Sequence, residues 1–222
     1  MSIQKSEITL NVNGTEVGAY LTSPVKGGPG ILLLHAWWGL KPFFKQVCDQ
    51  LAEQGFTVLA PDLYEGDIVR TIEEAKVLHE KKESAMDHMG SIVKAGKDSL
   101  VALQPGKPIG VIGFSMGAAW AIIAAAKEPD IAATVLFYGA YNPDLGKSKS
   151  KFLGHFSDND EWEPMENVQL MEQDIQKAGL DLALHIYPGV AHWFMEADRP
   201  EYDSEVAQLA WERTYKFLKE NL

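Results

Sequence analysis

One serine stands where an apolar run meets an alanine-rich run, with a glycine two residues away on each side. Residues 109–114 are typical of a buried strand and residues 116–126 of a helix. A turn this sharp strains the backbone of the serine, and Gly113 and Gly117 remove side chains that would collide there. Because the helix begins directly after Ser115, its unpaired N–H groups favour negative charge beside the hydroxyl. The pattern predicts a nucleophilic serine.

Two later segments supply the groups that such a serine needs. A serine hydroxyl is a poor nucleophile at neutral pH, so an imidazole must take its proton and a carboxylate must orient the imidazole. The predicted strand 151–156 is followed by Asp158 and Asp160, and the predicted strand 182–187 is followed by His192. We expect His192 to act as the general base.

The carboxylate has more than one candidate, because Asp158, Asp160 and Glu161 lie close together. Asp160 lies deeper in the turn, and Trp162 and Pro164 follow it and would fix the loop. We therefore prefer Asp160, with Asp158 as the alternative.

The other histidines are expected to be structural. His155 and His185 lie within predicted strands, and His35 ends a strand in the region where an oxyanion hole is expected. His79 and His88 lie in a helical stretch without ligand partners at metal spacing. We therefore expect no metal ion and no other cofactor.

The elements that position these residues alternate along the chain. After a hairpin over residues 7–22, the predicted strands are 31–34, 56–61, 109–114, 133–137, 151–156 and 182–187. The predicted helices are 43–54, 71–103, 116–126, 164–178 and 202–222. This order predicts an α/β fold in one domain, residues 1–222, whose mostly parallel central sheet has helices on both faces. In such sheets the chemistry collects at the carboxyl ends of the strands.

The composition limits the kinds of molecule to which this protein is expected to bind and the compartment in which it is expected to work. The net charge of −11 argues against nucleic acid and anionic membrane surfaces, which would require a basic face. No apolar run approaches the roughly 20 residues of a membrane span, and the N-terminus lacks the apolar core of a signal peptide. The single cysteine, Cys48, excludes an internal disulfide and fits a reducing compartment. We expect a cytoplasmic protein, either a monomer or a small homo-oligomer.

The order serine, aspartate, histidine is that of the α/β-hydrolases. From about residue 30 to the C-terminus, the chain resembles the dienelactone hydrolase family of that superfamily. Besides the serine turn, the resemblance rests on the segments 37–39, 60–64, 155–164 and 187–192. It implies the α/β-hydrolase fold and places the family's acid on Asp160. It also implies that the backbone N–H groups of Trp37 and Met116 form the oxyanion hole.

The positions at which this chain differs from the namesake enzymes bear on which substrate it accepts. The namesake enzymes carry a cysteine and a glutamate where this chain has Ser115 and Ala36. The two changes agree, because a second carboxylate would disfavour the alkoxide that develops on serine. The two arginines that hold the substrate's carboxylate in those enzymes are replaced by Glu65 and Glu196. Two acids should repel an anionic lactone, so the substrate need not be dienelactone.

These residues predict a cofactor-free hydrolase that cleaves a carboxylic ester or lactone through an acyl-serine. The absence of a long insertion favours small or medium soluble substrates over lipids. The expected substrate pocket consists of Ala36, Trp38, Tyr64, Glu65, Tyr138, Trp162, Trp193 and Glu196. Two alternatives stay open: an acyltransferase or peptidase using the same residues, and a non-catalytic binding protein that keeps the fold.

Overall fold

The computed structural model describes residues 2–83 and 85–222. Over these residues the chain forms eight strands and six helices. They fall into two compact units, of which the first ends at Lys107 and the second begins at Pro108. The expected single domain over residues 1–222 stays a prediction.

The first unit holds four strands in the order β1-β2-β4-β3. Their bounds are Ile3–Val12 for β1, Thr15–Pro24 for β2, Gly30–Leu34 for β3 and Thr57–Pro61 for β4. The predicted hairpin is confirmed, because β1 and β2 pair antiparallel around Asn13 and Gly14, which both have positive φ. β2 also pairs antiparallel with β4, and β3 pairs parallel with β4.

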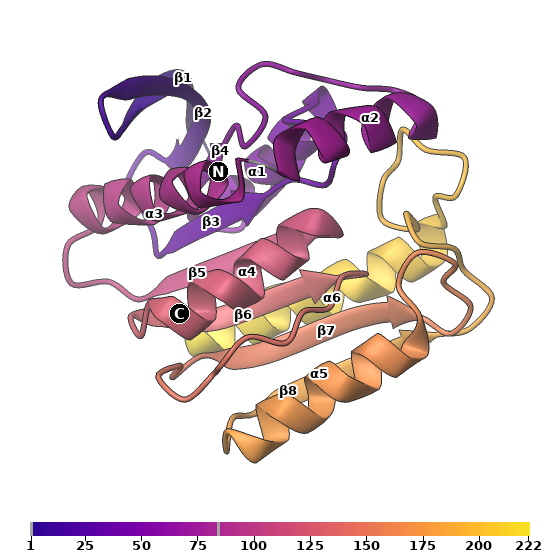
Figure 1. Ribbon diagram of the computed structural model, residues 1–222. Coiled ribbons are helices and arrows are strands. Elements are labelled where there is room, and N and C mark those ends of the chain that lie inside the picture. The colour runs from indigo at the N-terminus through magenta and orange to yellow at the C-terminus, as the bar shows by residue number, and fades with distance from the viewer. Residues whose placement is uncertain (1, 84) are drawn as a thin grey trace. The chain divides into compact units, whose positions relative to one another are not determined.

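The helices of the first unit are α1 (Pro42–Glu53), α2 (Ile72–Glu83) and α3 (Met86–Leu103). α1 packs against β2 and β4, and α3 packs against β3 and β4 (Figure 1). α3 approaches the strands closely at Gly96, where an added Cβ would lie 2.9 Å from a methyl group of Leu32. The helical pattern predicted over residues 71–103 is found as two helices, since α2 ends at Glu83 and α3 begins at Met86. The apolar spacing continues across the break, so the pattern did not reveal it.

The second unit holds four parallel strands in the order β5-β6-β7-β8. Their bounds are Ile109–Phe114 for β5, Ile131–Phe137 for β6, Lys151–Ser157 for β7 and Leu182–Tyr187 for β8. α4 (Met116–Lys127), α5 (Met165–Lys177) and α6 (Ser204–Asn221) accompany them. Figure 1 shows α4 in front of β5 and β6 and α6 behind β6 and β7. The predicted strands and helices of this part of the chain are confirmed within two residues at each end.

The register of these strands brings their carboxyl ends to one edge. Phe114 at the end of β5 pairs with Phe137 at the end of β6, and Phe137 pairs with His155 of β7. Ser157, the last residue of β7, pairs with Tyr187, the last residue of β8. The turns after β5, β6, β7 and β8 therefore lie together, which is the arrangement that a site built from strand ends requires.

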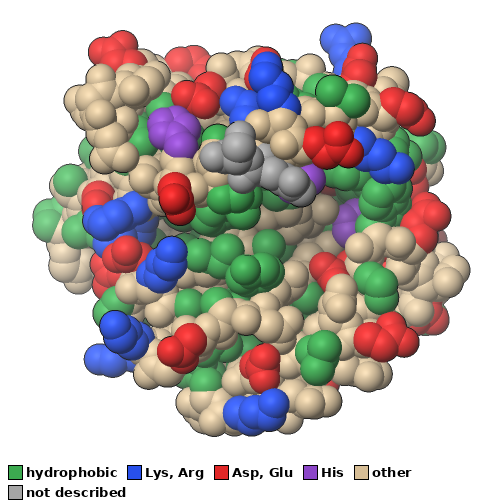
Figure 2. Space-filling model, viewed as in Figure 1, with side chains coloured by type: hydrophobic (Ala, Val, Ile, Leu, Met, Phe, Trp, Pro, Cys, Tyr) green, Lys and Arg blue, Asp and Glu red, His purple; other side chains and the backbone are tan. Residues whose placement is uncertain are grey.

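The surface carries both signs of charge. On the face that Figure 2 shows, Lys and Arg side chains stand among Asp and Glu side chains. Within helices, opposite charges also pair, as Lys94 does with Asp98 at 2.5 Å and Lys177 with Asp174 at 3.0 Å. Among the helices of the described residues, none has the length and apolar character needed to cross a membrane.

Candidate active site

The turn between β5 and α4 holds Ser115 in a strained conformation. Its φ is 52° and its ψ is −116°, a combination that costs about 1–3 kcal/mol for a residue with a side chain. The Ser115 N–H donates to the Phe137 carbonyl at 2.9 Å, which fixes the turn against β6. A Cβ on Gly113 would lie 2.2 Å from the Gly117 carbonyl oxygen, so the predicted need for glycine at position 113 is confirmed. The strain presents the hydroxyl at the edge of the sheet.

His192 lies in the loop after β8 and is within hydrogen-bonding distance of the serine. Its Nε2 is 2.9 Å from the Ser115 Oγ, and its Nδ1 is 2.7 Å from the Asp160 Oδ2. The side chains of His192 and Asp160 are 5% and 1% exposed, so little water competes for these contacts. A carboxylate on Nδ1 holds the ring proton there and leaves Nε2 free to accept from the hydroxyl. We call Ser115, His192 and Asp160 the triad.

The loop after β7 distinguishes the two candidate aspartates. The Asp160 Oδ1 accepts from the N–H groups of Trp162 at 2.8 Å and Glu163 at 2.9 Å, which aims Oδ2 at the imidazole. Asp158 instead accepts from the Gly189 N–H at 3.0 Å and is exposed. The structure brings Asp160 to His192 and leaves Asp158 at the surface.

Tyr138 packs directly against the imidazole. It follows β6 with a φ of 41°, and its ring centroid lies 5.0 Å from that of His192. Its hydroxyl donates to the Glu196 Oε1 at 3.1 Å. Burial and the neighbouring Glu196 carboxylate raise the pKa of Tyr138 well above its usual value, so the phenol keeps its proton.

Glu196 differs from the expectation. Its side chain is fully buried and accepts a hydrogen bond from Tyr138. It is not among the residues that line the cavity beside His192. The predicted contact of Glu196 with the substrate therefore has no support here. A carboxylate can turn inward where it finds a hydroxyl donor, and the sequence gives no sign of that donor.

A second carboxylate near the triad was not found from the sequence. Glu163 accepts from the Ala140 N–H at 2.7 Å and from the Asn167 side-chain amide at 2.9 Å. Partial burial raises the pKa of Glu163, although both hydrogen bonds oppose the shift. Its main partner is a backbone amide, so no pattern of side chains could have revealed it.

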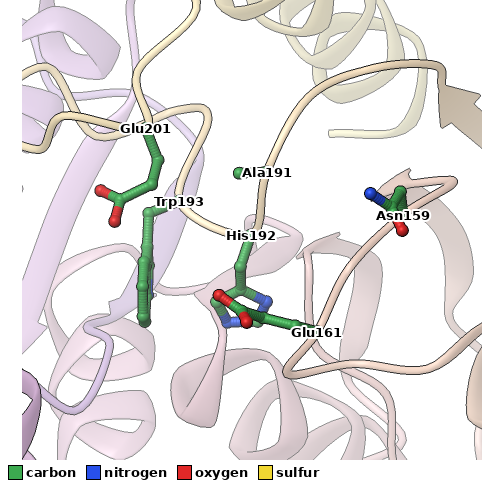
Figure 3. A pocket seen from close by; sticks show the side chains of 6 residues that line it. All are labelled: Asn159, Glu161, Ala191, His192, Trp193 and Glu201. Atoms are coloured by element: carbon green, nitrogen blue, oxygen red, sulfur yellow. The ribbon is translucent and has the colours of Figure 1, made fainter.

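A cavity of about 420 Å³ opens beside the imidazole. It is lined by Asn159, Glu161, Ala191, His192, Trp193 and Glu201. Figure 3 shows these side chains, with the Glu161 and Glu201 carboxylates on the lining that also holds His192 and Trp193. Glu201 is paired with Arg199, whose guanidinium also lies 4.8 Å above the Trp193 ring.

Of the pocket residues predicted in the second unit, Trp193 alone lines this cavity. Trp162 packs on Trp193 with ring centroids 5.5 Å apart, and Tyr138 is fully buried behind the imidazole. Neither lines this cavity, and their predicted place in a substrate pocket stays a prediction. The sequence analysis did not single out Asn159, Ala191 and Glu201, and it considered Glu161 only as the acid.

The predicted pocket residues of the first unit follow β3 and β4. Ala36, Trp38 and Tyr64 are buried. Glu65 has a φ of 56°, and its carboxylate contacts Lys82 at 3.4 Å and His88 at 3.2 Å. Partial burial raises the pKa of Glu65, but these two partners outweigh it and the net shift is downward. Because its charge is compensated, Glu65 repels an anion less than the sequence suggested.

The oxyanion hole stays a prediction. Met116 is the first residue of α4, directly after Ser115. Trp37 follows β3 in the first unit.

Two other histidines have structural partners, as expected. The His35 Nδ1–H donates to the Ala36 carbonyl at 2.7 Å, and its Nε2 accepts from the Leu63 N–H at 3.0 Å. His155 lies between the hydroxyls of Tyr187 at 2.9 Å and Thr214 at 3.0 Å. Across the described residues, no three His, Cys, Asp or Glu side chains gather into a group that could hold a metal ion.

Comparisons with known proteins identify the family. The profile of the Dienelactone hydrolase family matches residues 17–222. Protein usf of Aquifex pyrophilus is 35% identical over 221 residues, covering 95% of this chain and 96% of that protein. A putative carboxymethylenebutenolidase of Aquifex aeolicus (strain VF5) is 32% identical, covering 93% of this chain and 94% of that protein.

The fold is also that of a solved relative. The crystal structure of a putative dienelactone hydrolase from Klebsiella pneumoniae superimposes with a TM-score of 0.85 at 23% identity, covering 99% of this chain and 100% of that one. The family profile spans the chain from β2 to its last residue, and the Aquifex pyrophilus relative spans almost all of it. The chain therefore belongs to the dienelactone hydrolase family and is a hydrolase with the α/β-hydrolase fold.

Proposed function

We propose that this protein hydrolyses a carboxylic ester or lactone through an acyl intermediate on Ser115. One observation carries the proposal: the hydroxyl, the imidazole and the carboxylate form a continuous chain of hydrogen bonds of 2.9 Å and 2.7 Å. Such a chain is what a neutral hydroxyl needs in order to attack a carbonyl carbon.

In the first half of the reaction, Ser115 Oγ attacks the carbonyl carbon while His192 Nε2 takes the hydroxyl proton. Asp160 stabilises the imidazolium that forms. The N–H groups of Met116 and Trp37 would hold the oxyanion of the tetrahedral intermediate. His192 then gives its proton to the departing alkoxide, the C–O bond breaks, and the acyl group stays on Ser115.

Water completes the reaction by the same route. His192 takes a proton from a water molecule as its oxygen attacks the acyl carbon, and then returns that proton to Ser115 Oγ as the ester bond breaks. The acid product leaves and the resting hydroxyl is restored. Among the side chains of the protein, only those of the triad need to move a proton.

The cavity beside His192 favours small substrates without a carboxylate. Glu161 and Glu201 supply two negative charges on its lining, and Arg199 pairs with Glu201. This leaves a net negative rim, which disfavours a substrate carboxylate. The relative from Aquifex aeolicus is named a putative carboxymethylenebutenolidase, and a butenolide is a lactone. We therefore include neutral lactones with neutral short-chain esters as the proposed substrates.

The deciding experiment uses Ser115→Ala and a matched control, Ser91→Ala, which removes an exposed hydroxyl from α3. We expect Ser115→Ala to lose hydrolysis of p-nitrophenyl acetate and labelling by a fluorophosphonate, with unchanged thermal unfolding. Ser91→Ala should keep both. Hydrolysis by Ser115→Ala at the rate of the unaltered chain would refute the proposal.

Two further readouts address the alternatives. Product analysis with competing alcohols or amines distinguishes hydrolysis from acyl transfer, and a peptide panel tests for peptidase activity. Failure of the folded, unaltered chain to react with the fluorophosphonate would favour a binding protein that keeps the fold.

A further inference from the structure

The turn after β6, residues 138–140, touches all three segments that carry the triad. Tyr138 packs on His192, as described above. At Gly139 an added Cβ would lie 2.3 Å from the Ser115 carbonyl oxygen, so the turn lies directly against the backbone of the nucleophile. The Ala140 N–H donates to the Glu163 side chain in the loop that carries Asp160. This one turn therefore contacts the nucleophile, the base and the loop of the acid.

Glu163 makes the connection to the acid in two ways. Its backbone N–H donates to the Asp160 Oδ1 at 2.9 Å, which helps to aim the other carboxylate oxygen at His192. Its side-chain Oε2 accepts from the Ala140 N–H at 2.7 Å, while Oε1 accepts from Asn167 at 2.9 Å. A residue whose amide orients the acid is thus itself fastened to the turn after β6.

We propose that Glu163 is a positioning residue for the triad, which fastens the Asp160 loop to the turn after β6. The inference rests on the proposed role of the triad in hydrolysis. Glu163 does not line the cavity beside His192, so it acts through Asp160 and His192.

Two variants test the hydrogen bond between Glu163 and Ala140. Glu163→Ala removes it, whereas Glu163→Gln keeps an oxygen that can accept from the Ala140 N–H. Glu166→Gln is the matched control, because Glu166 is an exposed acid in the first turn of α5. For each variant we would measure kcat and KM for p-nitrophenyl acetate, the rate of fluorophosphonate labelling and thermal unfolding.

We expect Glu163→Ala to lower kcat and the labelling rate about 10- to 100-fold with little change in KM, because a displaced acid misorients the base. Glu163→Gln should keep kcat and the labelling rate within about threefold of those of the unaltered chain, because its amide oxygen can still accept from the Ala140 N–H. Glu166→Gln should behave as the unaltered chain in every measurement.

A folded Glu163→Ala with unchanged kcat and labelling rate overturns the proposal. A Glu163→Gln that is as slow as Glu163→Ala overturns it equally, because the hydrogen bond to Ala140 would then not position the acid. Should Glu163→Ala unfold, Glu163→Leu takes its place, because leucine keeps much of the side-chain bulk and has no acceptor. Failure of the proposed function looks different, since the unaltered chain would then show no labelling that depends on Ser115.

Discussion

Replacing Asp160 by asparagine gives the sharpest test of the hydrogen-bond chain. The Asp160 Oδ1 accepts two backbone N–H groups, from Trp162 and Glu163, so an asparagine side chain should keep its carbonyl oxygen there. Its NH₂ group would then face the His192 Nδ1, which is 2.7 Å from the Asp160 Oδ2. An NH₂ group donates, so the ring nitrogen must accept and the ring proton moves to Nε2. In that tautomer Nε2 no longer accepts from Ser115.

The loss follows from this wrong tautomer. Where a triad aspartate is changed to asparagine with its geometry intact, kcat falls about 10⁴-fold. At about 1.36 kcal/mol for each tenfold change, this is roughly 5.4 kcal/mol of transition-state stabilisation. We therefore expect Asp160→Asn to lower kcat for p-nitrophenyl acetate by about 10³- to 10⁴-fold with KM little changed. Stopped-flow or long-time absorbance assays at pH 7.5 cover this range.

Asp158→Asn is the control for this substitution. Asp158 is two residues away and accepts from the Gly189 N–H, and an asparagine oxygen can accept the same hydrogen bond. Its kcat should stay within about threefold of that of the unaltered chain. A folded Asp160→Asn that retains more than a tenth of kcat, or an equal loss in Asp158→Asn, would refute the reasoning.

Three further outcomes follow from the second unit. Gly139→Ala should lower the free energy of unfolding, measured by urea titration, by about 1–3 kcal/mol, because the new Cβ would lie 2.3 Å from the Ser115 carbonyl oxygen. Gly18→Ala is the control, because the space around Gly18 is open. Tyr138→Phe, which removes a donor to the buried Glu196, should cost about 1–3 kcal/mol in the same assay, and an unchanged midpoint would contradict this. Burial and the nearby charges of His185 and Arg213 lower the pKa of His155 well below 6.5, so the folded chain binds its proton less readily than the unfolded chain. The stabilising contribution of the neutral ring is thus present above pH 6.5 and is lost as pH falls toward the folded pKa, by up to about 1.4 kcal/mol per pH unit. Relative to His155→Gln, the unaltered chain should therefore lose stability in urea titrations between pH 6.5 and 5; a constant difference would show that His155 titrates alike in both states.

The sequence by itself determined the fold class and which side chains could meet. Continuous apolar runs identified the buried strands, and Asn13-Gly14 identified the hairpin, because both signals are local. Since parallel strands bring their carboxyl ends to one edge, the residues that follow β5, β7 and β8 had to lie near one another. The contacts of His192 with Ser115 and Asp160 were therefore within reach of reasoning from spacing alone.

Only the tertiary structure decided how the other acids near those strand ends are used. Glu196 turns inward to the Tyr138 hydroxyl, Glu65 is compensated by Lys82 and His88, and Glu163 accepts from the Ala140 amide. In each case the partner lies at least 17 residues away along the chain. A glutamate in the sequence does not show whether its carboxylate will face solvent, a cation or a backbone amide. That choice depends on which distant segment packs against it, because a buried carboxylate is stable only where donors or opposite charges are already in place.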